Sequence, residues 1–474
     1  STAAITKVVV STGAVLVEEG SQVKLPWRLL LTPVRGAGKP HVADFTTRYF
    51  HMQRYTTVQQ AVQSVPAAWI ILHQGNQLNP FINYPFLTVE PLRNYVRTAH
   101  AAGAKVKLYY TVRELSTSAV ELWALRSLAG EVIVPSREMG GHAWLREHVR
   151  SNYSASWHER LSDGEVDSSV HTPAFTTRWD NYWIEGILWL VRNLDIDGIY
   201  LDGAPYERSV LRRLRAALEP LTARRARPFK LDLHASCAGN PHLPYVELYP
   251  YLDSLWFGEQ CDYTSYSPEQ WLAEVSGIPF GLQGEVLGNQ QHQWHGLTFG
   301  MTCRIYPHPN ECDPKPIWAE LDRLGLRTPR MLGWWESKSP ILVKTVALGG
   351  VSDPVRATLF IGDTTFAIAV ANWSPSPVAF TLGLEWVVLE ALGLPRAAHR
   401  NAQLKAHRID GFQQRRTWEL GAQLTLQGKG SGHEEGLLLE LSIVEPLQST
   451  VEQSANLKPT LQRGGGGGAK TEQQ

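Results

Sequence analysis

The chain has no excess of either charge, few cysteines and no long hydrophobic run. Among its 474 residues, Lys plus Arg and Asp plus Glu number 45 each, so the formal net charge is zero. A chain without net charge produces no long-range field that would hold nucleic acid. No run of about eighteen apolar residues is present, so no segment is expected to span a membrane. The sequence therefore predicts a protein that binds neither nucleic acid nor a membrane.

Several catalytic motifs are also missing. The sequence contains no G-x-S-x-G nucleophile elbow, no H-E-x-x-H zinc motif, no phosphate-binding P-loop and no C-x-x-C pair. A metal-dependent barrel hydrolase with His and Asp ligands stays open as a third hypothesis, although the H-x-H pair typical of such sites is absent from the first predicted strand. The leading expectation is chemistry without a metal or an organic cofactor.

The four cysteines suggest an oxidising compartment. They form two candidate pairs, Cys237 with Cys261 and Cys303 with Cys312. Disulfides persist outside the cytosol, so two bridges would make the protein extracellular or secreted, whereas four free thiols are the alternative. Asn152 and Asn372 begin N-glycosylation sequons, and a proline after the second weakens it. Together these features favour a secreted glycoprotein.

From residue 28 onward, apolar β-type runs alternate with amphipathic stretches, which is typical of βα units and a parallel sheet. Helical spacing occurs, for example, in Pro91–Ala102 and Trp179–Asn193. The predicted strands are Arg28–Val34, Trp69–Gln74, Lys105–Arg113, Gly198–Asp202, Lys230–His234, Ser254–Glu259, Pro279–Glu285 and Met331–Glu336. Eight strands favour a closed (β/α)8 TIM barrel. An open doubly wound sheet would carry a Gly-rich phosphate turn after its first strand, and none is found.

The pattern of predicted strands and helices divides the α/β chain into regions. The barrel is predicted over residues 28–340, after short β segments in residues 1–27. Residues 115–178 form a long insertion after the third strand, which we expect to cover the catalytic face as a lid. Alternating strands then predict a C-terminal antiparallel β-sandwich over residues 341–446. The Gly-rich stretch 447–474 is expected to be a flexible tail.

Acidic residues end or follow several predicted strands, where (β/α)8 enzymes place their chemistry. Asp202 ends the fourth strand, Glu259 the sixth and Glu285 the seventh, and Asp262 follows shortly after Glu259. Two carboxylates facing each other across a pocket are used in glycoside hydrolysis, one as nucleophile or base and the other as proton donor. Spacing does not choose among the four acids, and a loop-bracing Asp202 or a salt-bridged Glu259 are structural alternatives.

Polar side chains at the other strand ends are expected to line the same mouth and to bind sugar hydroxyls. The predicted substrate-binding residues are His73, Gln74, Asn76, Tyr110, Arg113, His234, Asp262 and Trp334. Arg113 could instead neutralise a carboxylate or an anionic sugar. The chain also has 17 Trp, and surplus aromatic rings suit the apolar faces of sugars, although most are expected to be core residues.

Six segments carry a resemblance to a known family. They read RYFHMQRY, ILHQGNQLNPFINYPF, VKLYYTVRELS, DGIYLDGAPYER, LWFGEQCDY and SGIPFGLQGEVLG. They resemble (β/α)8 glycoside hydrolases grouped near the family 123 N-terminal-domain-like proteins, over roughly residues 28–440. The resemblance implies a catalytic barrel followed by a β-sandwich. The site layout is also similar to the retaining α-galactosidase clan, which implies Asp202 as nucleophile and Glu259 as acid/base. The adjacent Asp-Glu pair of family 123 is not found at a strand end.

The leading hypothesis is a secreted glycoside hydrolase that cleaves O-glycosidic bonds of a poly- or oligosaccharide with two carboxylates. The alternative is a non-catalytic glycan-binding or structural module of a larger extracellular protein. The distance between the Asp202 and Glu259 carboxyls would separate retaining from inverting chemistry.

Overall fold

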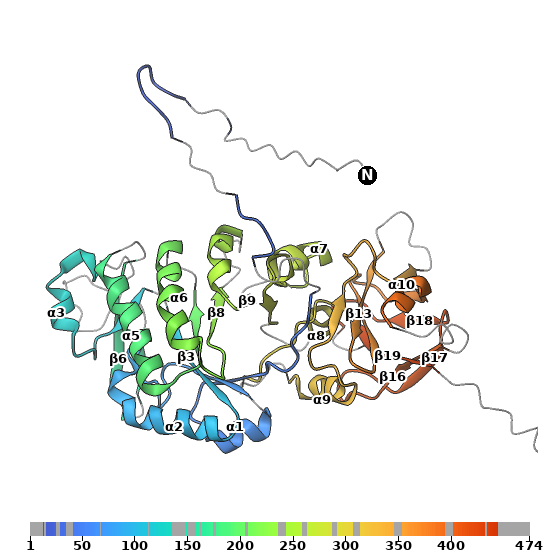
Figure 1. The fold of residues 1–474 in the computed structure, drawn as a ribbon, viewed down its shortest axis with the longest axis horizontal. Helices are drawn as coiled ribbons and strands as arrows, with labels where there is room; N and C mark the ends of the chain where they lie inside the picture. The colour runs from blue at the N-terminus through green and yellow to red at the C-terminus, as the bar shows by residue number, and fades with distance from the viewer. Residues whose placement is uncertain are drawn as a thin grey trace, which may run out of the picture.

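The computed structural model describes most of the chain, in segments. They are residues 13, 16–24, 29–34, 41–66, 68–111, 113–134, 148, 158–161, 163–173, 177–203, 207–235, 243–257, 263–286, 292–306, 313–345, 353–393, 402–431 and 434–443. A βα domain and a C-terminal β domain lie side by side (Figure 1). Residues 16–24, within the predicted N-terminal β segments, form no strand. The predicted tail, 447–474, lies outside the described residues.

A ring of parallel strands forms the first domain. Seven strands make one curled sheet, in the order β1 (Tyr49–Met52), β2 (Trp69–Leu72), β3 (Lys105–Thr111), β7 (Gly198–Asp202), β8 (Lys230–Ala235), β9 (Ser254–Phe257) and β10 (Gln283–Gly284). Residues 302–305 close the ring. Ile305 pairs in parallel with Phe50 of β1, and Cys303 pairs in parallel with Val286 just after β10. The predicted TIM barrel is confirmed.

The first and eighth predicted strands are wrong. Residues 29–34 contain no strand, and Leu29 and Leu31 are 75% and 77% exposed. The segment predicted as the eighth strand instead contains β11 (Arg330–Leu332), which pairs antiparallel with β13 in the C-terminal domain. Both errors have the same cause. Each segment was predicted as a barrel strand from its local apolar run, and such a run does not show which strand the segment pairs with. The true eighth position consists of isolated bridges at Cys303 and Ile305, so it does not stand out in the sequence.

Helices cover the outside of the barrel, among them α2 (Val89–Ala101), α5 (Arg178–Leu194) and α6 (Arg208–Thr222) (Figure 1). A capping box starts α5, since the Thr177 hydroxyl accepts from the Trp179 amide at 3.1 Å and the Asp180 carboxylate accepts from the Thr177 amide at 2.9 Å. Both predicted helices are confirmed. The other helices are α1 (Val58–Ser64), α3 (Leu122–Arg126), α7 (Pro268–Gln270), α8 (Gln293–Leu297), α9 (Lys315–Arg323) and α10 (Trp386–Ala391).

The insertion after β3 folds into a small antiparallel sheet in the order β4-β6-β5. Its strands are β4 (Glu114–Ser116), β5 (His158–Arg160) and β6 (Val166–His171). The buried Asp167 carboxylate joins this sheet to the barrel, because it accepts from the Ser116 and Ser118 hydroxyls and from the Ile82 amide at 3.1 Å. The insertion is therefore attached next to the loop that follows β2.

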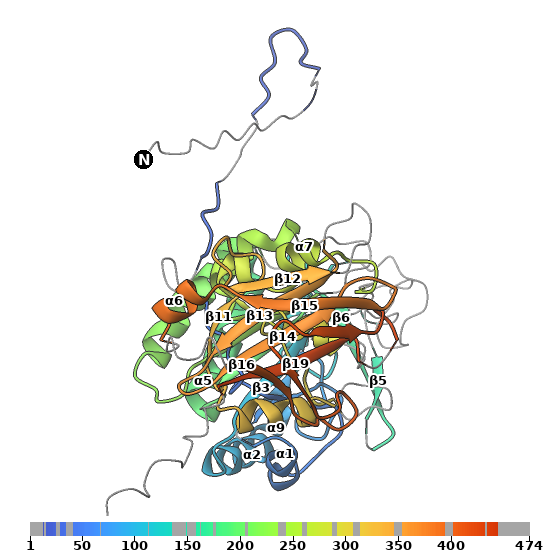
Figure 2. The ribbon, with the colours of Figure 1, turned by 90° about the vertical axis from the view of Figure 1, so that its right-hand side faces the viewer.

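The C-terminal domain consists of two facing antiparallel sheets (Figure 2), which confirms the predicted β-sandwich. The larger has the order β11-β13-β14-β19-β16-β17, and the smaller β12-β15-β18. In β14, Ala367 and Ala369 join the barrel-side core, whereas Ile368 and Val370 join the sandwich core. The larger sheet is thus buried on both faces. Strand bounds are β12 (Ile341–Thr345), β13 (Val355–Ile361), β14 (Phe366–Asn372), β15 (Val378–Leu384), β16 (Ala402–Ala406), β17 (Arg416–Glu419), β18 (Gln423–Leu426) and β19 (Gly436–Ile443).

The predicted glycosylation site at Asn372 is wrong. Asn372 is fully buried, and its side-chain amide donates to the carbonyls of Ser376 at 2.9 Å and Gln427 at 2.8 Å. A side chain engaged in this way is inaccessible to a glycan. Asn152 lies outside the described residues.

Candidate active site

Inward-pointing side chains fill the barrel in two levels. Along β3, Tyr109 joins the aromatic cluster inside the barrel, whereas Leu108 and Tyr110 join the core outside it. Lys107, two residues earlier, also points inward and contacts Asp232 of β8. Because parallel strands run in one direction, Lys107 and Asp232 lie deeper, and the residues at the strand ends form the mouth.

Asp202, the last residue of β7, is the carboxylate of the mouth. Its side chain is 33% exposed, and one carboxylate oxygen lies 3.1 Å from Nδ1 of His234. The other oxygen accepts a hydrogen bond from the Tyr109 hydroxyl. Burial acts to raise the pKa of Asp202, but the hydrogen bonds from His234 and Tyr109 outweigh it and leave the pKa lowered. The result is an ionised carboxylate with an accessible edge.

Two histidines extend the mouth toward β1 and β2. The ring of His73 packs 4.2 Å from the ring of Tyr109, and the ring of His51 lies 5.2 Å from that of His73. Burial is the largest cause that lowers the pKa of each histidine, and the nearby Arg304 lowers it further. Both rings are therefore neutral near pH 7.

Arg304 supplies a cation from the segment that closes the barrel. Its guanidinium lies 2.6 Å from Nδ1 of His51 and donates to the Tyr200 hydroxyl at 3.1 Å. It also lies over the ring of Tyr306, 5.0 Å from the centroid. His51 and Arg304 were not among the predicted site residues, because the segments that carry them were not predicted as the first and eighth strands.

Asp202, His73 and His234 are predicted site residues that the structure brings together at the mouth. Gln74 and Asn76 lie with His73 in the wall of the cavity beside it. The prediction that Tyr110 lines the mouth is wrong. Tyr110 lies in the core outside the barrel, and its neighbour Tyr109 occupies the predicted place, because successive side chains of a strand point to opposite faces. The alternation along β3 was the signal that could have identified Tyr109.

Two further predicted residues, Arg113 and Trp334, have no contact with the residues of this mouth in the described segments. Arg113 is exposed just after β3, with a φ of 66°, and its backbone carbonyl accepts from the Thr172 amide at 2.7 Å. Trp334 follows β11 and therefore lies next to the C-terminal domain, with the Arg356 guanidinium 4.7 Å from its ring centroid. The misassigned eighth strand explains the error in placing Trp334.

Glu285 occupies the deep level. It is 2% exposed, and burial raises its pKa well above the usual value, with Lys230 and Lys107 acting in the opposite direction. Asp232 is another charged neighbour of Glu285. A buried position among these charged side chains favours a structural role for Glu285. Its catalytic role stays a prediction. Glu259 and Asp262 lie outside the described residues.

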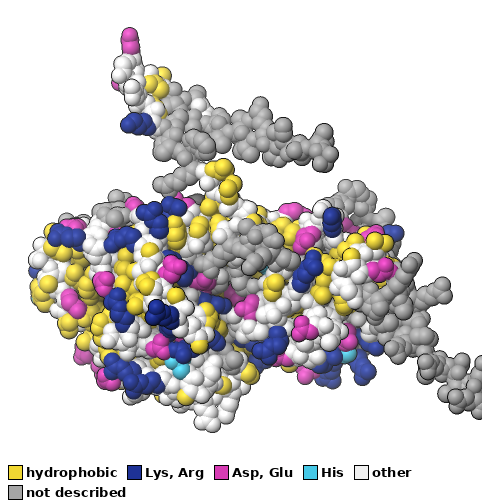
Figure 3. Space-filling model, in the orientation of Figure 1, with side chains coloured by type: hydrophobic (Ala, Val, Ile, Leu, Met, Phe, Trp, Pro, Cys, Tyr) yellow, Lys and Arg dark blue, Asp and Glu magenta, His cyan; other side chains and the backbone are white. Residues whose placement is uncertain are grey.

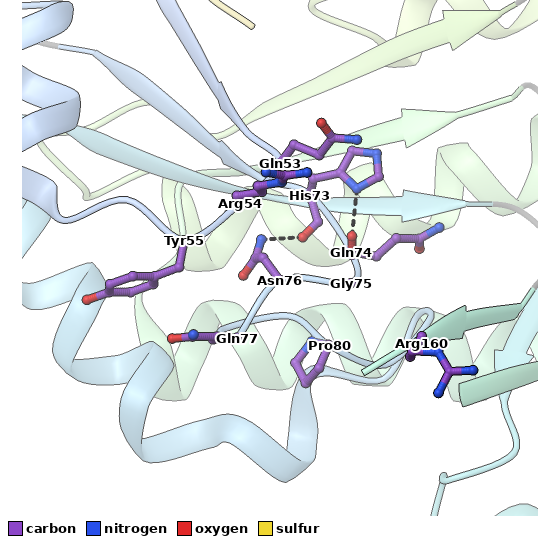
Figure 4. A pocket seen from close by; sticks show the side chains of 10 residues that line it. All are labelled: Gln53, Arg54, Tyr55, His73, Gln74, Gly75, Asn76, Gln77, Pro80 and Arg160. Atoms are coloured by element: carbon purple, nitrogen blue, oxygen red, sulfur yellow. Dashed lines mark hydrogen bonds between the residues drawn. The ribbon is translucent and has the colours of Figure 1, made fainter. Parts of the chain in front are cut away.

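A cavity of about 460 Å³ opens beside the mouth, at the ends of β1 and β2 (Figure 4). It is lined by Gln53, Arg54, Tyr55, His73, Gln74, Gly75, Asn76, Gln77, Pro80 and Arg160. Asn76 shapes this wall, since its side-chain oxygen accepts from the Leu78 amide at 2.8 Å and its amide donates to the His73 carbonyl. Arg160 comes from β5, so the insertion predicted as a lid forms part of the wall.

The sequence matches the family described as "Glycoside hydrolase 123, TIM-barrel domain" over residues 41–306. The chain belongs to this glycoside hydrolase family. Residues 313–442 match "Glycoside hydrolase 123, C-terminal domain", so both domains of the glycoside hydrolase are accounted for. No curated protein sequence matches the chain.

Solved structures similar to this glycoside hydrolase include a maltogenic alpha-amylase from Thermotoga neapolitana, with 10% identity and a TM-score of 0.48 over 85% of this chain and 99% of that chain. An alpha-amylase from Geobacillus thermoleovorans has 12% identity and a TM-score of 0.47, over 84% and 99%. A GH27 β-L-arabinopyranosidase from Geobacillus stearothermophilus has 11% identity and a TM-score of 0.45, over 85% and 98%. The family assignment depends on the two domain matches.

The described segments of the glycoside hydrolase lack two other features. No helix among them is long and apolar enough to cross a membrane. Within the same segments, no group of three or more His, Cys, Asp or Glu side chains could hold a metal ion.

Proposed function

We propose that this glycoside hydrolase cleaves O-glycosidic bonds of a poly- or oligosaccharide, with Asp202 as nucleophile or base and Glu259 as proton donor. One observation carries the proposal. Asp202 ends a barrel strand with one accessible edge and a lowered pKa, and Tyr109 and His234 hold it on its other sides. An ionised carboxylate in a fixed orientation is what attack on an anomeric carbon, or activation of a water, requires.

The neighbours of Asp202 supply orientation. His73 places its Nδ1 2.6 Å from the Gln74 carbonyl, which only accepts, so Nδ1 carries the proton of the neutral ring. Nε2 is then an acceptor that can bind a sugar hydroxyl. Tyr109 orients Asp202 through the hydrogen bond from its hydroxyl.

The assignment of Glu259 depends on its place in the sequence. It follows Phe257, the last residue of β9, by two positions, and β9 is the sixth strand of the ring. A carboxylic acid there would face Asp202 across one side of the mouth. The separation of the two carboxyls would decide between retention and inversion.

The Asp202→Asn variant tests the proposal, with Asp363→Asn on an exposed turn as a matched control. Release of reducing ends from a panel of polysaccharides is measured for both variants, together with thermal unfolding. We expect Asp202→Asn alone to lose turnover by about 10³-fold or more, without a change in melting temperature. Undiminished turnover would reject Asp202, and saturable binding without product from the wild type would favour a glycan-binding module.

We also propose an extracellular location. Cys303 is not a free thiol, and the other three cysteines lie outside the described residues. Disulfides are typical of extracellular proteins. Alkylation of the unreduced, unfolded protein followed by mass measurement should detect no free cysteine, and four alkylated cysteines would contradict the proposal.

A further inference from the structure

The cavity beside Asp202 has an unusual charge for a sugar site. Its ten lining residues include two arginines, Arg54 and Arg160, and no carboxylate. The other lining side chains are mainly neutral polar groups. Elsewhere, on the face shown in Figure 3, basic and acidic side chains are interspersed, and the whole chain has no net charge. The positive charge of the cavity is thus a local feature of the described wall.

The two arginines come from different parts of the fold. Arg54 follows β1, whereas Arg160 ends β5 of the insertion (Figure 4). Among the described residues neither side chain pairs with a carboxylate, and the Arg160 guanidinium donates to the Gly164 carbonyl at 3.0 Å. Guanidinium groups without an acidic partner are suited to bind a carboxylate or a sulfate.

Neutral side chains of the cavity are suited to bind the hydroxyl groups and the apolar face of a sugar. Gln74 is only 4% exposed, and its side-chain oxygen is buried without a hydrogen-bond partner in the described structure. A buried acceptor without a partner is costly, and a sugar hydroxyl would satisfy it. Tyr55 is 46% exposed and offers an aromatic face at the opening.

His73 connects the cavity to the reacting carboxylate. It lines the cavity and packs against the ring of Tyr109, whose hydroxyl donates to Asp202. A sugar unit in the cavity would therefore lie next to the unit that is cleaved.

We infer that this cavity is a subsite for an anionic oligosaccharide, whose carboxylate or sulfate groups are bound by Arg54 on one side of the cavity and by Arg160 on the other. The inference rests on the proposed function and names its substrate class: acidic poly- or oligosaccharides carrying uronate or sulfate groups. Arg54 and Arg160 are specificity-determining residues, and Gln74 with His73 binds hydroxyls.

Binding is measured by calorimetry on the Asp202→Asn protein, so that catalysis does not affect the result. The probes are an oligogalacturonate, a sulfated chondroitin oligosaccharide and a neutral cello-oligosaccharide. We expect at least one anionic probe to bind, more weakly at high salt, and to lose about 10-fold in affinity with Arg54→Gln or Arg160→Gln added. Arg97→Gln, an exposed residue of α2, is the matched control and should change nothing.

Three outcomes would overturn the inference. They are no binding of either anionic probe, equal binding of the neutral probe, and affinities unchanged within twofold in the Arg54→Gln/Arg160→Gln double variant. Hydrolysis of the best-binding probe by the wild type is followed separately. Arginine-dependent binding without product would sink the proposed function alone, whereas turnover that is indifferent to the arginines would sink the subsite alone.

Discussion

Two acidic groups inside the same barrel behave in opposite ways. Asp202 at the mouth is 33% exposed, and two hydrogen-bond donors leave its pKa lowered. Glu285 at the deep level is 2% exposed, and burial raises its pKa well above the usual value. Both end predicted strands in the sequence. Solvent exposure and hydrogen-bond partners, and not the position at a strand end, therefore determine which carboxylate is ionised and available.

The deep level is an ionic network with no access to solvent. Lys107 and Asp232 form an ion pair with both side chains 0% exposed. The Ser254 hydroxyl donates to Asp232 at 2.7 Å, and the Tyr49 ring lies 4.7 Å from the Lys107 ammonium. Burial lowers the pKa of Lys107 to about 8. Each charge of this ion pair needs the other, because neither side chain can be solvated by water.

Substitution of Asp202 at the mouth should change activity more than any other variant considered below. Asp202→Asn removes the ionised carboxylate of the mouth, so turnover should fall by about 10³-fold or more while the unfolding temperature stays constant. The measurement is initial rate together with thermal unfolding. If unfolding changes and the rate per folded molecule does not, Asp202 belongs with the structural residues.

The next effect concerns stability. Lys107→Met leaves Asp232 as a buried charge without its partner, and we expect a loss of about 3–5 kcal/mol in the free energy of unfolding. The double variant Lys107→Met/Asp232→Asn should recover most of that loss, because it removes both charges. Urea unfolding of the three proteins measures the effect, and additive losses in the double variant would contradict coupling of the pair.

A pair of adjacent tyrosines gives a matched comparison at the mouth. Tyr109→Phe deletes a hydrogen bond to the ionised Asp202, and such bonds contribute about 1.5–3 kcal/mol, so the rate should fall about 10- to 100-fold. The acid limb of the pH–rate profile should also move to higher pH, since the lost bond held the pKa of Asp202 down. Tyr110→Phe, on the opposite face of β3, should leave the rate per folded molecule unchanged. Equal profiles for the two variants would contradict the described orientation.

The smallest effect concerns the pH dependence of stability. Because the folded pKa of Glu285 is raised, the folded protein binds a proton that the unfolded chain has lost, and wild-type stability declines as pH rises above the unfolded pKa. Glu285→Gln keeps the neutral form, so it should raise the unfolding free energy by about 1 kcal/mol near neutral pH and very little at about pH 4. Unfolding at both pH values tests this, and destabilisation at neutral pH would mean that Glu285 is ionised.

Much of the architecture could be read from the sequence, because its signals are local. Strands β2, β3 and β7, the helices α2 and α5, and the change to alternating strands after the barrel all follow from side-chain periodicity. Asp202 was identifiable for the same reason, since it directly follows an apolar strand within a βα pattern. These features depend on residues that are neighbours along the chain.

The tertiary structure alone decided which segments pair and which way their side chains point. Closure of the barrel by residues 302–305 against β1 joins residues about 250 positions apart, and no local pattern encodes such a pairing. The same closure brings Arg304 to His51, while β11 takes Trp334 to the other domain. The choice of Tyr109 over Tyr110 depends on which side of the strand faces the barrel axis. The difference between a partly exposed Asp202 and a buried Glu285 depends on how deep each residue lies in the barrel. Burial and charge state are properties of that assembly, and the residue type alone does not specify them.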